Sequence, residues 1–129
     1  MGRLPDRRPA TENLLTMHEL SIALNIIDII DETCRNEKDP AVREIVIRVG
    51  DLSGVDTEAL STCLHIASRN TLLQEAHVRI LRQPGTGWCA HCRKEFPMED
   101  ILTPCPECFQ PASELREGRE MQIDSIVVE

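Results

Sequence analysis

Four cysteines in the C-terminal part of the chain have the spacing of a metal site. Cys89 and Cys92 form one C-x-x-C pair, Cys105 and Cys108 form a second, and twelve residues separate the two pairs. Each pair can direct two thiolates from one tight turn at a single centre, and two such turns complete a tetrahedron around a soft divalent cation. Protein sulfurs then fill every coordination position, which leaves no place for water or substrate. The pattern predicts a structural Zn²⁺ site.

Two other uses of these cysteines are conceivable. They could form disulfide or redox pairs, or they could hold an iron ion that carries electrons. A metal is favoured over disulfides because the sequence has no membrane-spanning apolar run and no export signal after Arg7-Arg8, which predicts a cytoplasmic protein. The segment 88–109 also has too few apolar residues to fold alone, and a structural zinc ion would supply the missing folding energy.

His18 and Glu19 form a second candidate metal site, although a purely structural interpretation is available. Thr16 and Glu19 have the spacing of a capping box, which would make them the start of a helix at Met17. Alternatively, an imidazole, a neighbouring carboxylate and backbone nitrogens make a small site that suits Ni²⁺ or Cu²⁺ in square-planar geometry. Asp56 could add a further carboxylate, or it could be the N-cap of the helix that follows it.

The composition limits the choice of partners and the make-up of the core. The net charge of −8 and the lack of a basic patch argue against nucleic acid as a partner. Aromatic residues make up only 2% of the chain, so the core must be built from aliphatic side chains. We expect no enzyme, because the sequence pairs no nucleophile with a base and an orienting residue and has no phosphate-binding glycine loop.

The segments around these candidate sites predict a small α+β protein. Residues 1–16 are expected to form a disordered arm. Regular periodicity predicts helices over 17–35 and 57–69 and strands over 41–49, 77–83 and 120–128, with a β-bulge near Asp124-Ser125. We expect a small three-stranded antiparallel sheet packed with two helices (17–88 plus 118–129) and an inserted four-cysteine zinc ribbon (89–117).

Several motifs, taken in order, resemble a known family. The stretch "MHEL" (17–20) opens an apolar helix, and "VGDLSGV" (49–55) follows the first strand. The paired C-x-x-C knuckles come next, and "GRE" (118–120) then leads into "SIVVE" (125–129). Together these motifs resemble the HypA/HybF family of nickel metallochaperones for [NiFe]-hydrogenase maturation. The resemblance covers residues 17–129.

The resemblance implies a function in nickel delivery. Nickel would bind weakly and reversibly through Met17, His18 and Glu19, and Asp56 occupies the position of an acidic residue that contributes in some members. The zinc would be structural and the nickel transient. The implied partners are a GTPase of the nickel pathway and the hydrogenase large-subunit precursor, and some members also serve urease. We expect a monomer or a weak homodimer without a membrane span or a nucleic-acid partner.

The chain departs from the family pattern in two places. Sixteen residues precede Met17, so a free amino group is not at the expected position. Some relatives carry a histidine just after each knuckle, where this chain has Arg93 and Phe109. The alternative function is a zinc-ribbon adaptor for protein–protein contacts, in which His18 and Glu19 only begin a helix.

Overall fold

The computed structural model describes the backbone of residues 10–129 and the side chains of residues 18–129, so most of the predicted arm, residues 1–9, lies outside the described part. The described elements are α1 (Ala10–Thr33), β1 (Val42–Gly50), α2 (Thr57–Ala67), β2 (His77–Gln83), β3 (Gly85–Cys89), β4 (Lys94–Met98), β5 (Glu114–Glu117) and β6 (Met121–Val128). Neither described helix combines the length and apolar character that crossing a membrane requires.

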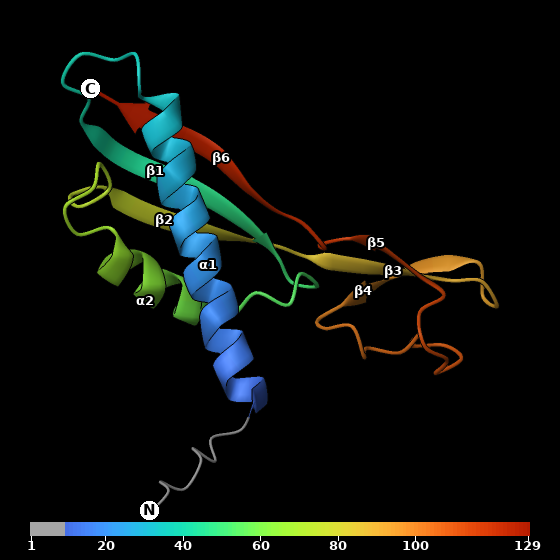
Figure 1. The fold of residues 1–129 in the computed structure, drawn as a ribbon. Helices are drawn as coiled ribbons and strands as arrows, with labels where there is room; N and C mark the ends of the chain where they lie inside the picture. The colour runs from blue at the N-terminus through green and yellow to red at the C-terminus, as the bar shows by residue number, and fades with distance from the viewer. Residues whose placement is uncertain (1–9) are drawn as a thin grey trace, which may run out of the picture.

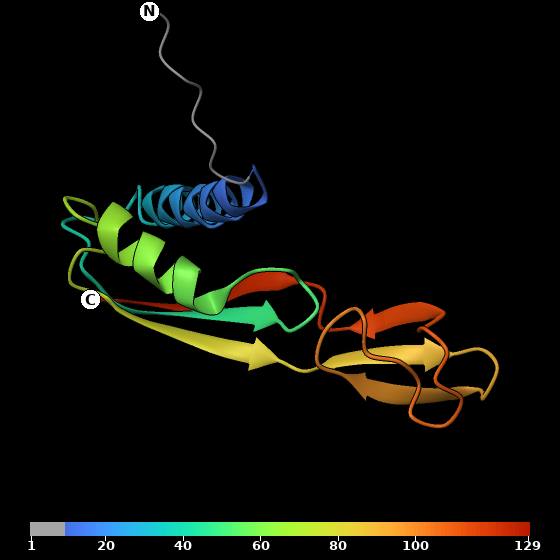
Figure 2. The same cartoon turned by 90° about the horizontal axis from the view of Figure 1, so that it is seen from below.

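The main sheet has the strand order β2-β1-β6, and both helices cover the same face of it (Figures 1 and 2). Strand β1 pairs with β6 in antiparallel orientation. The register of this pair shifts between Val46, opposite Ser125, and Ile47, opposite Ile123, so Asp124 is left over. This irregularity confirms the predicted β-bulge, and the predicted combination of two helices with a small sheet is confirmed as well.

The direction of one strand pair differs from the prediction. Strand β1 pairs with β2 in parallel, with Glu44 opposite His77 and Gly50 opposite Gln83, so the main sheet is mixed rather than wholly antiparallel. The reason lies in the connection. Helix α2 joins the two strands. Such a helical crossover returns the chain to the end of the sheet at which β1 begins, so β2 runs in the same direction as β1. Alternation within each strand carries no information about this direction.

The core between the helices and the main sheet is aliphatic, as the low aromatic content predicts. Its buried residues include Ile26, Ile30, Ile45, Ile47, Leu60 and Leu64. On α1 the buried row continues toward the N-terminus through Ala23 to Glu19, at helical spacing. Leu20 and Leu24 are 39% and 49% exposed. At this end of α1 a carboxylate, and not these leucines, therefore points into the core.

The start of α1 also differs from the prediction. The helix begins at Ala10, so residues 10–16 are helical where the sequence predicts a disordered arm, and Thr16 is a residue within the helix. A residue within a helix has no free N-terminal amides to cap. The capping-box interpretation of Thr16 and Glu19 is thus wrong. Glu19 has a different hydrogen-bond partner, in a distant part of the chain.

The cysteine-containing insertion forms a second, antiparallel sheet with the order β4-β3-β5. It extends from the end of the main sheet at which β2 leads into β3 and β5 leads into β6 (Figure 1). Its small core contains the side chains of Leu52, Cys89, Phe96, Met98 and Cys105. Leu52 belongs to the loop after β1, so the insertion borrows a core residue from outside its own segment. This second sheet is called the ribbon below.

Candidate metal sites

Each C-x-x-C pair lies in a tight turn closed by one backbone hydrogen bond. The N–H of Arg93 donates to the carbonyl oxygen of Cys89 at 2.7 Å, and the N–H of Phe109 donates to that of Cys105 at 2.8 Å. Arg93 (φ 55°) and Phe109 (φ 62°) both adopt the left-handed conformation. The two turns therefore have matching backbones, and each one directs its two sulfurs toward the other turn.

The four sulfur atoms have the spacing of a metal centre. All of them lie within 4.8 Å of one another. The Sγ atoms of Cys89 and Cys108 are 3.5 Å apart, and those of Cys92 and Cys105 are 3.9 Å apart. A regular tetrahedron with zinc–sulfur bonds of ~2.3 Å places its sulfurs about 3.8 Å apart, whereas a disulfide requires ~2.05 Å. These cysteines are free thiols arranged for metal binding, and not two disulfides.

Without a metal, the thiols of this cluster would not ionise together. The backbone N–H of Cys108, with that of Glu107, stabilises the thiolate of Cys105 and lowers the pKa of Cys105 to about 7. Desolvation and hydrogen bonds with the neighbouring thiols raise the pKa of Cys92 to about 12. The Cys105 thiol is therefore about half ionised near neutral pH, and a bound cation must displace the remaining protons.

Glu19 is the unusual residue of the second candidate site, because its side chain is fully buried. Its Oε1 atom accepts a hydrogen bond from the backbone N–H of Asp56 at 3.1 Å. Its Oε2 atom is buried without a hydrogen-bond partner among the residues whose side chains are described. A buried carboxylate oxygen without a partner is costly, and a bound cation would offset that cost.

His18 and Asp56 flank this buried carboxylate. The imidazole of His18 is 54% exposed, and its Nδ1 atom lies 3.6 Å from Oε1 of Glu19. The Oδ1 atom of Asp56 accepts hydrogen bonds from the N–H groups of Glu58 and Ala59, at 3.0 and 3.1 Å, which confirms the predicted N-cap of α2. The fold therefore brings the side chains of His18 and Glu19 to the backbone of Asp56, while the carboxylate of Asp56 caps α2.

Met17, the fourth predicted ligand, is placed only in part. Its backbone lies within α1, next to His18, and its side chain is outside the described part of the structure. Its nitrogen is therefore an amide within a helix. A sequence signal for the burial of Glu19 does exist, since the residue is one turn before Ala23 in the apolar row of α1, but the capping-box pattern conceals it.

The surroundings of Asp56 suit a cation. A hollow of about 370 Å³ lies beside it and is lined by Asp51, Asp56, Glu58 and Arg82 among others. Arg82 pairs with Asp51 at 2.8 Å, so acidic groups outnumber basic ones in this hollow. A surplus of negative charge raises the local concentration of cations.

Comparison with known proteins shows which family this chain resembles. Residues 17–128 match the family model described as hydrogenase/urease nickel incorporation, metallochaperone, HypA. The hydrogenase maturation factor HypA of Dechloromonas aromatica is 32% identical over 113 residues, which are 88% of this chain and 100% of that protein. HypA of Geotalea daltonii is 37% identical over 112 residues, which cover 87% of this chain and 99% of the relative.

The fold has counterparts among solved structures. The nickel metallochaperone HypA from Helicobacter pylori superposes with a TM-score of 0.57 at 18% sequence identity, over 84% of this chain and 94% of that one. At this identity the likeness concerns the fold alone. The family match, over residues 17–128, covers the main sheet together with the ribbon.

Proposed function

Because this chain belongs to the HypA family of nickel metallochaperones for hydrogenase and urease maturation, we propose that it binds Ni²⁺ reversibly where His18, Glu19 and Asp56 meet. The observation that carries this proposal is the hydrogen bond between Oε1 of Glu19 and the N–H of Asp56. It brings an accessible imidazole and a buried carboxylate to the start of α2, where Asp56 lines an acidic hollow. The comparisons do not support the alternative of an adaptor without nickel.

Each residue would have its own part in holding the cargo. His18 supplies an exposed imidazole nitrogen, and the adjacent backbone nitrogen of Met17 or His18 can complete a square-planar set with it. Asp56 supplies a carboxylate at the rim, while Glu19 holds α1 and α2 together and adds negative charge beneath the ion. Few and partly exposed ligands allow Ni²⁺ to leave again, which delivery requires.

The cysteine cluster would hold a different ion for a different purpose. We assign Zn²⁺ to Cys89, Cys92, Cys105 and Cys108, because the spacing of their sulfur atoms suits tetrahedral thiolate coordination. The small ribbon core cannot fold by itself, so this ion is structural. The protein would then act by transfer rather than catalysis, with a nickel-pathway GTPase and the hydrogenase large-subunit precursor as its partners.

Nickel titration of matched variants tests the proposed site. His18→Ala should weaken Ni²⁺ binding at least ~100-fold, since even residues that only orient a ligand contribute 10–100-fold. His65→Ala is the control, because it removes an exposed imidazole on α2 away from this site. Zinc content should be unchanged in both variants. Equal nickel affinity of His18→Ala and the wild type would rule out the site.

The segment before Met17 requires a second comparison. The family match begins at residue 17, so the preceding residues are additional to the family pattern. A chain that starts at Met17 would offer an amino group beside His18 in place of a helical amide. We expect this shorter chain to bind Ni²⁺ more tightly than the full chain, as measured by isothermal titration under identical conditions.

A further inference from the structure

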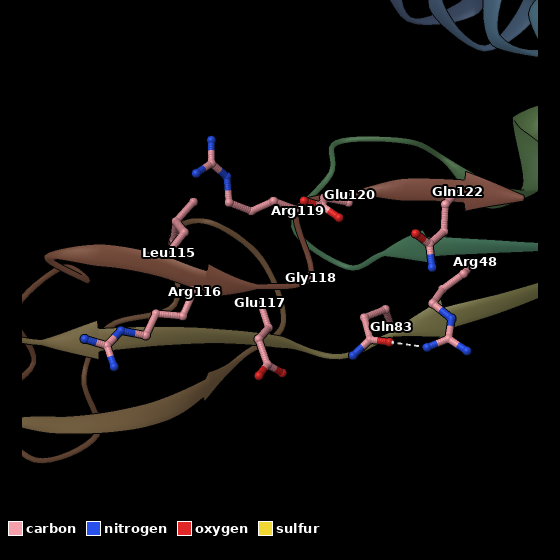
Figure 3. A pocket seen from close by; sticks show the side chains of 9 residues that line it. All are labelled: Arg48, Gln83, Leu115, Arg116, Glu117, Gly118, Arg119, Glu120 and Gln122. Carbon is pink, nitrogen blue, oxygen red and sulfur yellow. Dashed lines mark hydrogen bonds between the residues drawn. The ribbon is translucent and has the colours of Figure 1, made fainter. Parts of the chain in front are cut away.

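Residues 50–56, which run from the last residue of β1 to the N-cap of α2 and are called the loop below, are hydrogen-bonded at both connections between the main sheet and the ribbon. Three consecutive amides donate to these connections: Gly50 to Glu120 O at 2.8 Å, Asp51 to Gln83 O at 2.9 Å, and Leu52 to Gly118 O at 2.7 Å. Gln83 and Gly118 line a groove of about 610 Å³ at this junction (Figure 3). These three hydrogen bonds fix the position of the loop relative to the ribbon.

The side chain of Leu52 strengthens this attachment. It is 7% exposed and packs in the ribbon core with Phe96 and Met98 and with two of the four metal-site cysteines. It also fills the space above Gly85, where an added Cβ would lie 2.5 Å from its Cγ atom. An aliphatic residue of the nickel-binding part is therefore buried in the zinc-binding part.

The other end of the loop reaches Glu19 through further hydrogen bonds. The N–H and the Oγ of Ser53 both donate to the carbonyl of Gly50, at 3.0 and 2.7 Å. The N–H of Val55 donates to Oγ of Ser53 at 3.2 Å. The N–H of Asp56 then donates to Oε1 of Glu19 at 3.1 Å. A short bonded segment connects the ribbon core with the buried carboxylate.

We propose that Leu52 is a positioning residue of the nickel site, which acts by anchoring the loop that presents Asp56 to Glu19. Loss of its side chain frees the loop at its ribbon end, and the bond between Asp56 and Glu19 then opens more often. The effect of Leu52 on nickel affinity rests on the proposed function, whereas the anchoring of the loop by Leu52 does not. The two can therefore fail separately.

Hydrogen exchange of the Asp56 amide, followed by NMR in the zinc-loaded full chain, tests the anchoring. Leu52→Ala should exchange about tenfold faster at this amide and bind Ni²⁺ more weakly. Leu52→Met, which conserves volume, should restore both values. Leu115→Ala is the matched control, because it removes a leucine packed on the same core and leaves the sequence of the loop unchanged. In this variant the Asp56 amide should exchange as in the wild type.

A second variant keeps the test decisive if Leu52→Ala fails to retain zinc. Gly85→Ala leaves the loop sequence intact but places a methyl group where Leu52 packs, so the leucine must move. Gly85→Ala should therefore also accelerate hydrogen exchange of the Asp56 amide. Wild-type exchange in every variant that retains zinc would overturn the proposal. Faster exchange in a protein whose wild type binds no nickel would support the anchoring and contradict only the nickel function.

Discussion

The carboxylate of Glu19 accepts a hydrogen bond at 3.1 Å from the backbone N–H of Asp56, which lies 37 residues further along the chain. The bond joins α1 to the start of α2, where the side chain of the same aspartate caps the helix. Helix N-termini favour negative charge. The carboxylate is thus held in place by the fold, and His18, the preceding residue of α1, is held beside it.

Substitutions of Glu19 should separate its structural role from its charge. Glu19→Gln keeps an Oε1 acceptor for the N–H of Asp56, so the free energy of unfolding should change by less than ~1 kcal/mol. Nickel binding should weaken at least ~10-fold, because the negative charge is lost. Glu19→Ala should lose about 2–3 kcal/mol of stability, since it removes the bond and leaves a cavity. Urea unfolding and nickel titration measure these effects. Wild-type nickel affinity in Glu19→Gln would contradict a role for its charge.

Asp56 caps α2 and is also a proposed nickel ligand, and two substitutions distinguish these functions. Asn is as good an N-cap as Asp, so Asp56→Asn should preserve stability but weaken nickel binding. Asp56→Ala should weaken nickel binding as well, and loss of the cap should lower the free energy of unfolding by about 1 kcal/mol. Asp31→Asn, which neutralises an exposed acid on α1, serves as the control for net charge. If Asp56→Asn and Asp31→Asn have the same nickel affinity, Asp56 only caps the helix.

Removal of the ribbon metal should unfold part of the molecule only. The buried cluster between the helices and the main sheet is separate from the cluster around the cysteines. Cys92→Ser, or treatment with a strong chelator, should therefore collapse the dispersed NMR signals of β3 to β5 and preserve those of β1. Retention of ribbon signals after complete metal removal would show that the ribbon folds without an ion.

The features that sequence alone predicts are those fixed by local spacing. Two C-x-x-C turns need only their own residues to direct sulfurs at one point, so the cysteine centre is predictable from the pattern. The cap at Asp56 depends on the next three residues, and the bulge at Asp124 follows from a slip in the alternation. Each of these was predicted from neighbouring residues and is confirmed by the structure.

The features that sequence reasoning misses depend on distant partners. Thr16 and Glu19 satisfy a capping pattern, yet the helix begins at Ala10, and Glu19 bonds to Asp56 across the two-helix layer. The parallel pairing of β1 with β2 follows from the crossover by α2 and not from the strands. The burial of Leu52 in the ribbon is likewise decided by tertiary packing, since its own segment resembles a simple turn.

X-ray absorption at the nickel edge, recorded on the zinc-loaded protein with one equivalent of Ni²⁺, tests most directly whether nickel binds at His18. We expect only nitrogen and oxygen donors around nickel, with the multiple-scattering features of one imidazole. His18→Ala should remove those features, and His65→Ala should retain them. Sulfur donors around nickel, or an imidazole signal that persists in His18→Ala, would contradict nickel binding at the junction of α1 and α2.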